Sequence, residues 1–208
     1  MRMKKQLALL LNELQGIGQS GKKYGRDVFD QERYEQLLIV TSKLMNLLTN
    51  WDDEQIQQYL YTDDGYATPK VDVRSVVFVE DKLLLVKEKS DNSWTLPGGW
   101  GDIGYSPFEV AAKETLEEAG ISVKPLQLIA VKDKTKHDYP ESLTYVYKLF
   151  VYCEALDTTV TPGVETRDAD FFDQTESKKL KLSLARTSKE DIKEAFAYHH
   201  QPKNTVCD

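Results

Sequence analysis

A short helix marked at both ends by its own sequence is the feature that most constrains this chain. Ser106 and Glu109 form a capping box around Pro107, so we expect the helix to begin at Pro107. Gly120 favours the left-handed conformation that commonly ends a helix, which makes Ala119 the last helical residue. The chain therefore places one helix with defined ends after a glycine-rich stretch.

Three carboxylates crowd the second half of this helix, at Glu114, Glu117 and Glu118. Like charges three or four residues apart repel by about 0.2–0.5 kcal/mol in water and by more where water is scarce. A divalent cation would relieve that repulsion, because Mg²⁺ prefers oxygen ligands and is often shared between carboxylates and substrate phosphates. The upstream pair Gly98 and Gly99 would let a backbone carbonyl reach the same ion. We therefore expect the three carboxylates and Gly98 to bind Mg²⁺ or Mn²⁺; the alternative is a charged face in solvent.

The helical period also predicts which side of this helix packs against the rest of the protein. Successive residues turn by about 100°, so the small and apolar residues gather on one side and the three carboxylates on the other. The residues predicted to pack are Phe108, Ala112, Thr115, Leu116 and Ala119.

The stretch from Gly99 to Ile121 resembles the Nudix box. That pattern is Gly, five residues, Glu, seven residues, then Arg-Glu-U-x-Glu-Glu-x-Gly-U, where U is a bulky aliphatic residue. The positions that match in register are Gly99, Glu114, Glu117, Glu118, Gly120 and Ile121. Tyr105 stands in place of the first Glu, Lys113 in place of Arg, and Thr115 in place of an aliphatic residue. Lys keeps the charge of Arg but lacks the planar fork that could orient a neighbouring Glu.

This resemblance implies an enzyme that hydrolyses a pyrophosphate bond with Mg²⁺ or Mn²⁺. Ions bound at the box would screen the phosphate charges and lower the pKa of a bound water. A carboxylate would then accept the proton of that water. Glu114 in the box and Glu165 at the start of a late strand are both candidates for this role, and Glu117 is expected to be catalytic with them.

Four further residues are predicted to contact the substrate. Arg74 on an early strand could meet a phosphate, and Trp100 could line the pocket. His137 and Tyr139 lie in a polar loop from Lys134 to Ser142, where Tyr139 could stack on a base. The alternative for each is an ordinary packed or exposed side chain.

The segments around the box predict an α/β fold. Runs of β-branched and apolar residues indicate strands at residues 71–79, 83–87, 126–132, 143–153 and 165–172, and residues 188–200 are expected to form a closing helix. The resemblance implies a Nudix α/β/α sandwich with a mixed sheet, over residues 68–208.

Residues 1–64 are predicted to form a small all-helical domain ahead of the sandwich. The helices expected from periodicity are Lys4–Leu14, Asp30–Leu48 and Asp52–Tyr61. Gly16–Gly21 is expected to be a turn that ends the first helix. Short helices must bury their apolar faces, so we expect this domain to form a homodimer.

A second resemblance narrows the substrate. Residues 18–37 resemble the helical N-terminal domain of Nudix hydrolases from Gram-positive bacteria, among them CDP-choline pyrophosphatases. This implies a nucleoside diphosphate linked to another group, of the CDP-choline or ADP-ribose type, cleaved to a nucleoside monophosphate and a phosphorylated product.

Composition bounds the remaining possibilities. The formal net charge of −7 argues against a general nucleic-acid binder, so nucleic acid is expected only as an RNA substrate cleaved at its 5′ end. No apolar run approaches the length of a membrane span, and two cysteines do not form a disulfide framework, which favours the cytoplasm. A nucleotide-sensing regulator is the alternative from another class, but residues 1–60 carry eight basic and eight acidic residues rather than a basic recognition helix.

Overall fold

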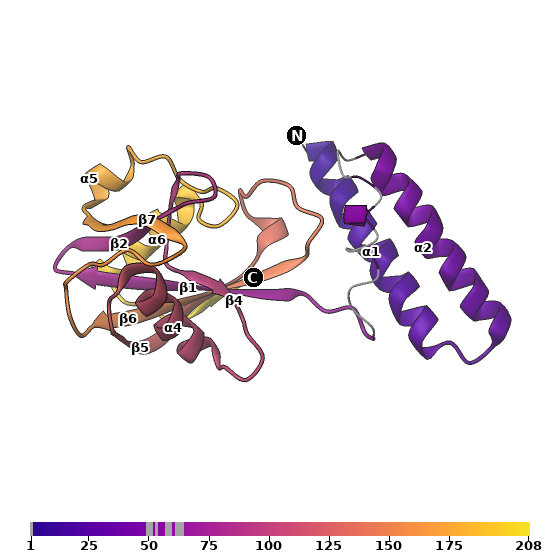
Figure 1. Ribbon diagram of the computed structural model, residues 1–208, viewed down its shortest axis with the longest axis horizontal. Helices are drawn as coiled ribbons and strands as arrows, with labels where there is room; N and C mark the ends of the chain where they lie inside the picture. Colours follow the sequence, from indigo (N-terminus) through magenta and orange to yellow (C-terminus); the bar gives the residue numbers. More distant parts are fainter. Residues whose placement is uncertain (1, 49–51, 53, 57–59, 61–64) are drawn as a thin grey trace. The chain divides into compact units, whose positions relative to one another are not determined.

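The computed structural model describes residues 2–48, 52, 54–56, 60 and 65–208 (Figure 1). The chain divides into two compact units. The helical unit comprises residues 1–69 and 141–145, and the sheet unit comprises residues 70–140 and 146–208.

Two long helices, α1 (Arg2–Tyr24) and α2 (Val28–Leu48), lie side by side in the helical unit. The hydrophobic core of this unit is a cluster of the buried residues Leu11, Met45, Ile56, Leu60 and Leu143. The predicted helix Asp52–Tyr61 and the linker after it fall largely outside the described residues.

The prediction that Gly16–Gly21 ends the first helix is wrong, because α1 continues through all of it. A Cβ atom at Gly18 would lie 2.7 Å from Cδ2 of Leu38, and one at Gly21 would lie 2.2 Å from Cδ1 of Tyr34. Helix α2 thus approaches α1 more closely than a side chain would permit. Packing between the helices outweighs the cost of about 1 kcal/mol that each helical glycine carries.

An eight-stranded mixed sheet forms the centre of the sheet unit. Its strands are β1 (Lys70–Val79), β2 (Lys82–Glu88), β3 (Trp94–Thr95), β4 (Gly98–Trp100), β5 (Val123–Asp133), β6 (Val146–Ala155), β7 (Thr166–Phe172) and β8 (Val206–Cys207). The order is β3-β2-β1-β6-β5-β8, with β4 paired to β1 and β7 paired to β2. Strands β1 and β6 are parallel, as are β5 and β8, while the other pairs are antiparallel.

Helices cover both faces of this sheet because β1 alternates apolar side chains between them. Val73 and Val77 face helix α4 (Pro107–Ala119) in one core cluster. Val76 and Phe78 face helix α6 (Lys189–His200) in a second cluster on the other side. A short helix, α5 (Gln174–Ser177), and a 3₁₀ turn, η1 (Lys134–Lys136), complete the unit. The predicted fold class, a sandwich with a mixed sheet that follows a helical region in the sequence, is confirmed.

Several strand ends differ from the prediction by one to three residues, and the starts of β6 and β7 leave predicted strand residues outside the strand. Strand β6 begins at Val146 rather than Leu143, because Leu143 is buried in the helical unit. Strand β7 begins at Thr166, so Glu165 precedes the strand.

Candidate active site

Helix α4 has the ends that its sequence predicts. The Ser106 hydroxyl accepts a hydrogen bond from the Glu109 amide at 3.3 Å, and the Glu109 carboxylate accepts one from the Ser106 amide at 2.8 Å. Gly120 ends the helix in the left-handed conformation, with φ of 72°. The carboxylates in the last two turns of α4 are therefore fixed relative to the strands on which the helix packs.

The face of α4 that packs is only partly the predicted one, because Thr115 and Ala119 are buried as predicted but Phe108 and Leu116 are not. The buried residues are Val110, Ala111, Thr115, Glu118 and Ala119, whereas Phe108 and Leu116 are 37% and 51% exposed. The helix is rotated so that Glu118 lies in the middle of the buried face instead of among exposed charges. The physical reason is a partner across the packing interface, which receives this carboxylate.

That partner is the turn leading into β4. The Gly98 amide donates a 3.0 Å hydrogen bond to Oε2 of Glu118, which is 7% exposed. Burial raises the pKa of the Glu118 carboxyl to about 8; the Gly98 amide and Arg74 oppose the rise, while Glu88 and Glu114 add to it. The site thus contains a buried acid whose negative charge is poorly compensated.

The two glycines of β4 create the room for these carboxylates. Gly98 has φ of 144°, and a Cβ there would lie 2.0 Å from the Val73 carbonyl oxygen. A Cβ at Gly99 would lie 3.0 Å from the carboxylate of Glu114. Only glycine fits at position 98, where a side chain would meet the backbone of β1, and glycine at position 99 leaves room for the side chain of Glu114.

The other two carboxylates of the helix, Glu114 and Glu117, form ion pairs with Lys113. Its ammonium lies 3.1 Å from Glu114, 3.3 Å from Glu117 and 3.3 Å from Asp102. Its hydrogen bonds to the carboxylates of Glu114 and Glu117 raise the pKa of Lys113. Across the residues that the structure describes, no three His, Cys, Asp or Glu side chains form a group that could hold a metal ion as they stand. Glu118 points to Gly98, whereas Glu117 is 57% exposed in its side chain and pairs with Lys113.

Three of the predicted substrate contacts are used elsewhere in the structure. Tyr139 is 5% exposed and its hydroxyl donates to both carboxylate oxygens of Asp191, at 2.7 and 2.6 Å. Its ring is therefore packed rather than open for stacking on a base. Nε2 of His137 lies 2.9 Å from Asp208. Arg74 is buried and its Nη2 lies 2.7 Å from Asp72, so its guanidinium is engaged by a carboxylate rather than free for a phosphate.

Two other predicted residues are accessible. Trp100 follows the glycine pair on β4 and is 54% exposed. Glu165 is exposed in the segment before β7, and its carbonyl accepts a hydrogen bond from the Lys89 amide at 3.1 Å. The structure leaves both side chains open to a substrate.

Sequence reasoning missed Glu88, which the fold brings to the same site. Glu88 is the last residue of β2 and is 7% exposed. Its charge contributes to the raised pKa of Glu118, and its Oε1 lies 3.3 Å from Nε of Arg186. An acid at the end of an apolar strand was the available signal, but its neighbours come from distant parts of the chain.

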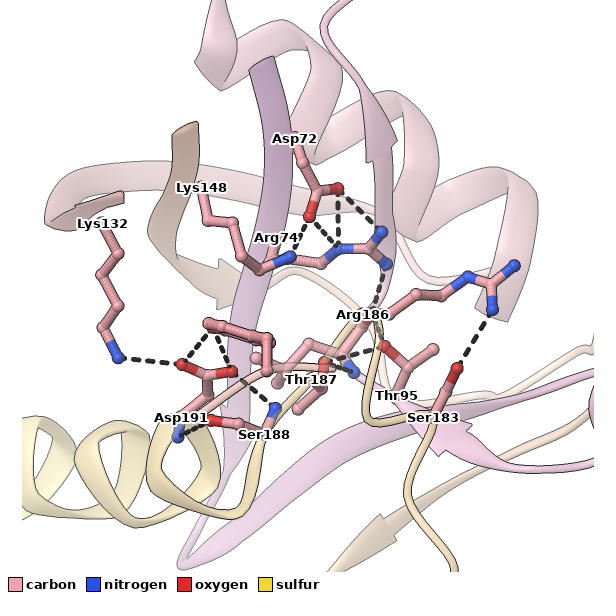
Figure 2. A network of polar contacts seen from close by, with 12 residues as sticks. Asp72, Arg74, Thr95, Lys132, Lys148, Ser183, Arg186, Thr187, Ser188 and Asp191 are labelled. Atoms are coloured by element: carbon pink, nitrogen blue, oxygen red, sulfur yellow. Dashed lines mark hydrogen bonds and ion pairs between the residues drawn. The ribbon is translucent and has the colours of Figure 1, made fainter. Parts of the chain in front are cut away.

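A buried polar network lies beside the site on the α6 face of the sheet (Figure 2). The carboxylate of Asp72 accepts hydrogen bonds from Arg74 of its own strand and from Lys148 of β6. Lys148 lies opposite Asp72 in the register of the two strands. Lys132 of β5, opposite Lys148, binds Asp191 at 2.8 Å. Burial lowers the pKa of Lys148 to about 8, and Arg74 adds to this while Asp72 opposes it.

Two known family models match this chain. The family model described as "NUDIX domain" matches residues 68–194, and the one described as "UDP-X-like, N-terminal oligomerisation domain" matches residues 5–60. A putative ADP-ribose pyrophosphatase of Bacillus subtilis is 38% identical over 94% of this chain and 93% of its own length.

Two solved structures are also similar. The crystal structure of a UDP-X diphosphatase is 31% identical, with a TM-score of 0.62 over 99% of both chains. That of an ADP-ribose pyrophosphatase from Streptococcus suis is 34% identical, with a TM-score of 0.61 over 68% of this chain and all of that one.

Proposed function

The chain belongs to the NUDIX family and is a pyrophosphohydrolase, and from that premise we propose that it cleaves a nucleoside diphosphate linked to a second group. The products are a nucleoside monophosphate and the phosphorylated second group. The observation that carries the proposal is the buried Glu118 carboxyl, which is held by Gly98 on the same helix as the two other matching box carboxylates, Glu114 and Glu117. The names of the similar proteins, which refer to ADP-ribose and UDP-X, support a conjugate over a free triphosphate. CDP-choline stays a prediction within the same class.

A divalent cation, Mg²⁺ or Mn²⁺, fits the donors at this site. Burial raises the pKa of Glu118 to about 8 and the charges of Glu88 and Glu114 add to the rise, so a cation would stabilise the ionised carboxylate. Oxygens of Glu114, Glu117, Glu118 and the Gly98 carbonyl are the groups that would hold it. When bound, the cation supplies charge stabilisation at the pyrophosphate and an acidified water.

The chain's own residues have separable roles in this proposal. Glu114 lies against Gly99 with its side chain 15% exposed, which suits a carboxylate that accepts a proton inside the site. Glu165 is the exposed alternative for the same role, and Glu117 acts with them on α4. Lys113 pairs with both Glu114 and Glu117 and so offsets part of the repulsion between them without an ion.

Substrate binding is proposed to use the exposed ring of Trp100, because an indole face can stack on any base. Chemistry at the pyrophosphate and recognition of the nucleoside are then carried by different groups.

The helical unit is proposed to form a homodimer, which agrees with the description of the matching family model as an oligomerisation domain. Large apolar side chains remain exposed on its helices, including Ile17, Phe29, Ile39, Val40 and Leu47. No helix in the described part of the chain is long and apolar enough to cross a membrane. Cys153 and Cys207 are both free thiols, which is consistent with our proposal of a cytoplasmic protein.

A substrate panel tests the proposal directly. The purified chain with Mg²⁺ or Mn²⁺ is offered ADP-ribose, UDP-sugars, CDP-choline, nucleoside triphosphates and 5′-triphosphate RNA. Products are identified by ³¹P NMR in H₂¹⁸O, which shows the phosphorus that water attacks. We expect a conjugate to be cleaved fastest. Rapid hydrolysis of triphosphates or RNA ends, with the conjugates left intact, would contradict it.

A further inference from the structure

The segment Leu96–Gly98, which carries the glycine turn into the site, is held from both sides of its backbone. The Leu96 amide donates to Oγ1 of Thr187 at 3.1 Å. The Leu96 carbonyl accepts from Nη1 of Arg74 at 3.2 Å. Two distant elements, β1 and the loop before α6, thus fix the two peptide units that flank the same residue, Leu96.

The next two residues are held as well. The Pro97 carbonyl accepts a 2.8 Å hydrogen bond from the Ser75 amide, and the Gly98 amide donates to Glu118. Every backbone group in this stretch that points toward β1 or α4 therefore has a partner. The orientation of Gly98, whose carbonyl is a proposed ion ligand, follows from these contacts.

Arg74 is itself held rigidly. Its Nε lies 3.0 and 3.2 Å from the two carboxylate oxygens of Asp72, while Nη2 lies 2.7 Å from Oδ1. Lys148 also donates to Asp72. Asp72, Arg74 and Lys148 are each at most 5% exposed. The planar guanidinium faces Asp72 with one edge and reaches Leu96 with Nη1, whereas a lysine presents a single nitrogen for both contacts.

We propose that Arg74 is a positioning residue, which holds the Leu96 carbonyl and thereby keeps Gly98 aligned with Glu118. This role rests on the proposed function, because it matters only if Glu118 and Gly98 act together at an ion. A buried ion pair is weak evidence of stabilisation by itself, since apolar residues of similar volume often serve as well. The contact from Arg74 to Leu96 supplies the reason for an arginine here.

The test compares Arg74→Lys with Lys132→Met. Arg74→Lys keeps the charge next to Asp72 and loses the contact to Leu96. Lys132→Met removes an equally buried cation from the same sheet face, where it binds Asp191 and Glu194 and not the Leu96 segment. Hydrogen exchange of the Gly98 amide is measured in metal-free protein, and the Mn²⁺ dissociation constant is measured by electron paramagnetic resonance.

We expect the Gly98 amide of Arg74→Lys to exchange at least about 10-fold faster than in the wild type. Its Mn²⁺ affinity should fall by about 10- to 100-fold, the usual effect of losing a group that orients a ligand. In turnover, kcat should fall while KM for the nucleotide conjugate stays the same. Lys132→Met should leave Gly98 exchange and Mn²⁺ affinity unchanged.

Several outcomes would overturn the role. One is a folded Arg74→Lys whose Gly98 exchange and Mn²⁺ affinity match the wild type; another is an equal effect in Lys132→Met. If Arg74→Lys does not fold, Thr187→Val releases the other side of Leu96 and should show the same two changes; no change there also refutes the role. Hydrogen exchange and Mn²⁺ binding can be measured without turnover, so they test the role of Arg74 independently of activity. If the wild type cleaves none of the conjugates, the proposed function alone is refuted.

Discussion

The Gly98 amide donates a hydrogen bond to Glu118 across the interface between β4 and α4, and this places a carboxyl in the core of the helix packing. The bond satisfies one oxygen but does not neutralise the charge. The pKa of Glu118 is consequently raised by burial to about 8.

The first prediction concerns the pH dependence of stability in metal-free protein. Because the Glu118 pKa is about 4.5 in the unfolded chain and about 8 in the folded one, the folded state retains a proton between those values that the unfolded state releases. This stabilisation is complete below pH about 4.5 and is lost as pH rises through about 8. Glu118→Gln should unfold like the wild type near pH 5 and be more stable by about 2–4 kcal/mol near pH 9. Urea unfolding in EDTA measures the difference, and a constant offset at both pH values would exclude this account.

The second prediction concerns turnover of the same variant. With saturating Mg²⁺, Glu118→Gln should lose about 100-fold or more in kcat, because a neutral amide cannot replace a carboxylate at the ion. Glu109→Gln is the matched control, since it changes a carboxylate on the same helix whose task is capping, which Gln can also perform. Near-normal kcat in Glu118→Gln would remove this carboxylate from the metal site.

The ends of α4 could be predicted from the sequence, whereas its packed face could be predicted only in part. Capping by Ser106 and Glu109 depends on residues within one turn, so local reasoning suffices. The rotation of the helix depends on Gly98, which lies 20 residues away and supplies the partner that lets Glu118 be buried. Hydrophobic periodicity favoured Leu116 as a packed residue, but no amide or charge on the sheet side enters that calculation.

The same limit explains the other differences. The glycines of α1 resemble a helix end until α2 is placed against them. Glu88 and Arg186 are 98 residues apart in sequence numbering and become neighbours only when the loop before α6 crosses the end of β2. Tyr139 lies in a polar stretch, which indicates exposure, yet its hydroxyl finds Asp191 in the core.

The third prediction is that Tyr139 acts in stability and not in recognition. Tyr139→Phe removes the donor to Asp191 and should lower the free energy of unfolding by about 1–3 kcal/mol. KM for the conjugate should be unchanged. Tyr66→Phe, at a ring that is 69% exposed, controls for loss of a hydroxyl. A raised KM with unchanged stability would restore the stacking role for Tyr139.

The fourth prediction concerns assembly. Light scattering at micromolar concentration should give twice the chain mass of 23.8 kDa. Val40 and Leu47 lie seven residues apart on α2, on one stripe, and are 46% and 80% exposed, so replacing both with Glu should yield a monomer. Gln31→Glu adds charge on the opposite side of α2 and should stay dimeric. A wild type that scatters as a single chain contradicts the prediction.

The last prediction concerns recognition of the nucleoside by Trp100. Its indole is half-exposed directly after the glycine pair, where a base linked to the pyrophosphate could reach it. Trp100→Ala should lower kcat/KM for a conjugate by about 1–3 kcal/mol, mostly through KM, because stacking stabilises the bound ground state and transition state alike. The Mg²⁺ requirement should not change, since no metal donor is altered. Ile103→Ala in the following loop, where the side chain is fully exposed, should leave both constants as they are. If the two variants behave alike, the base binds elsewhere.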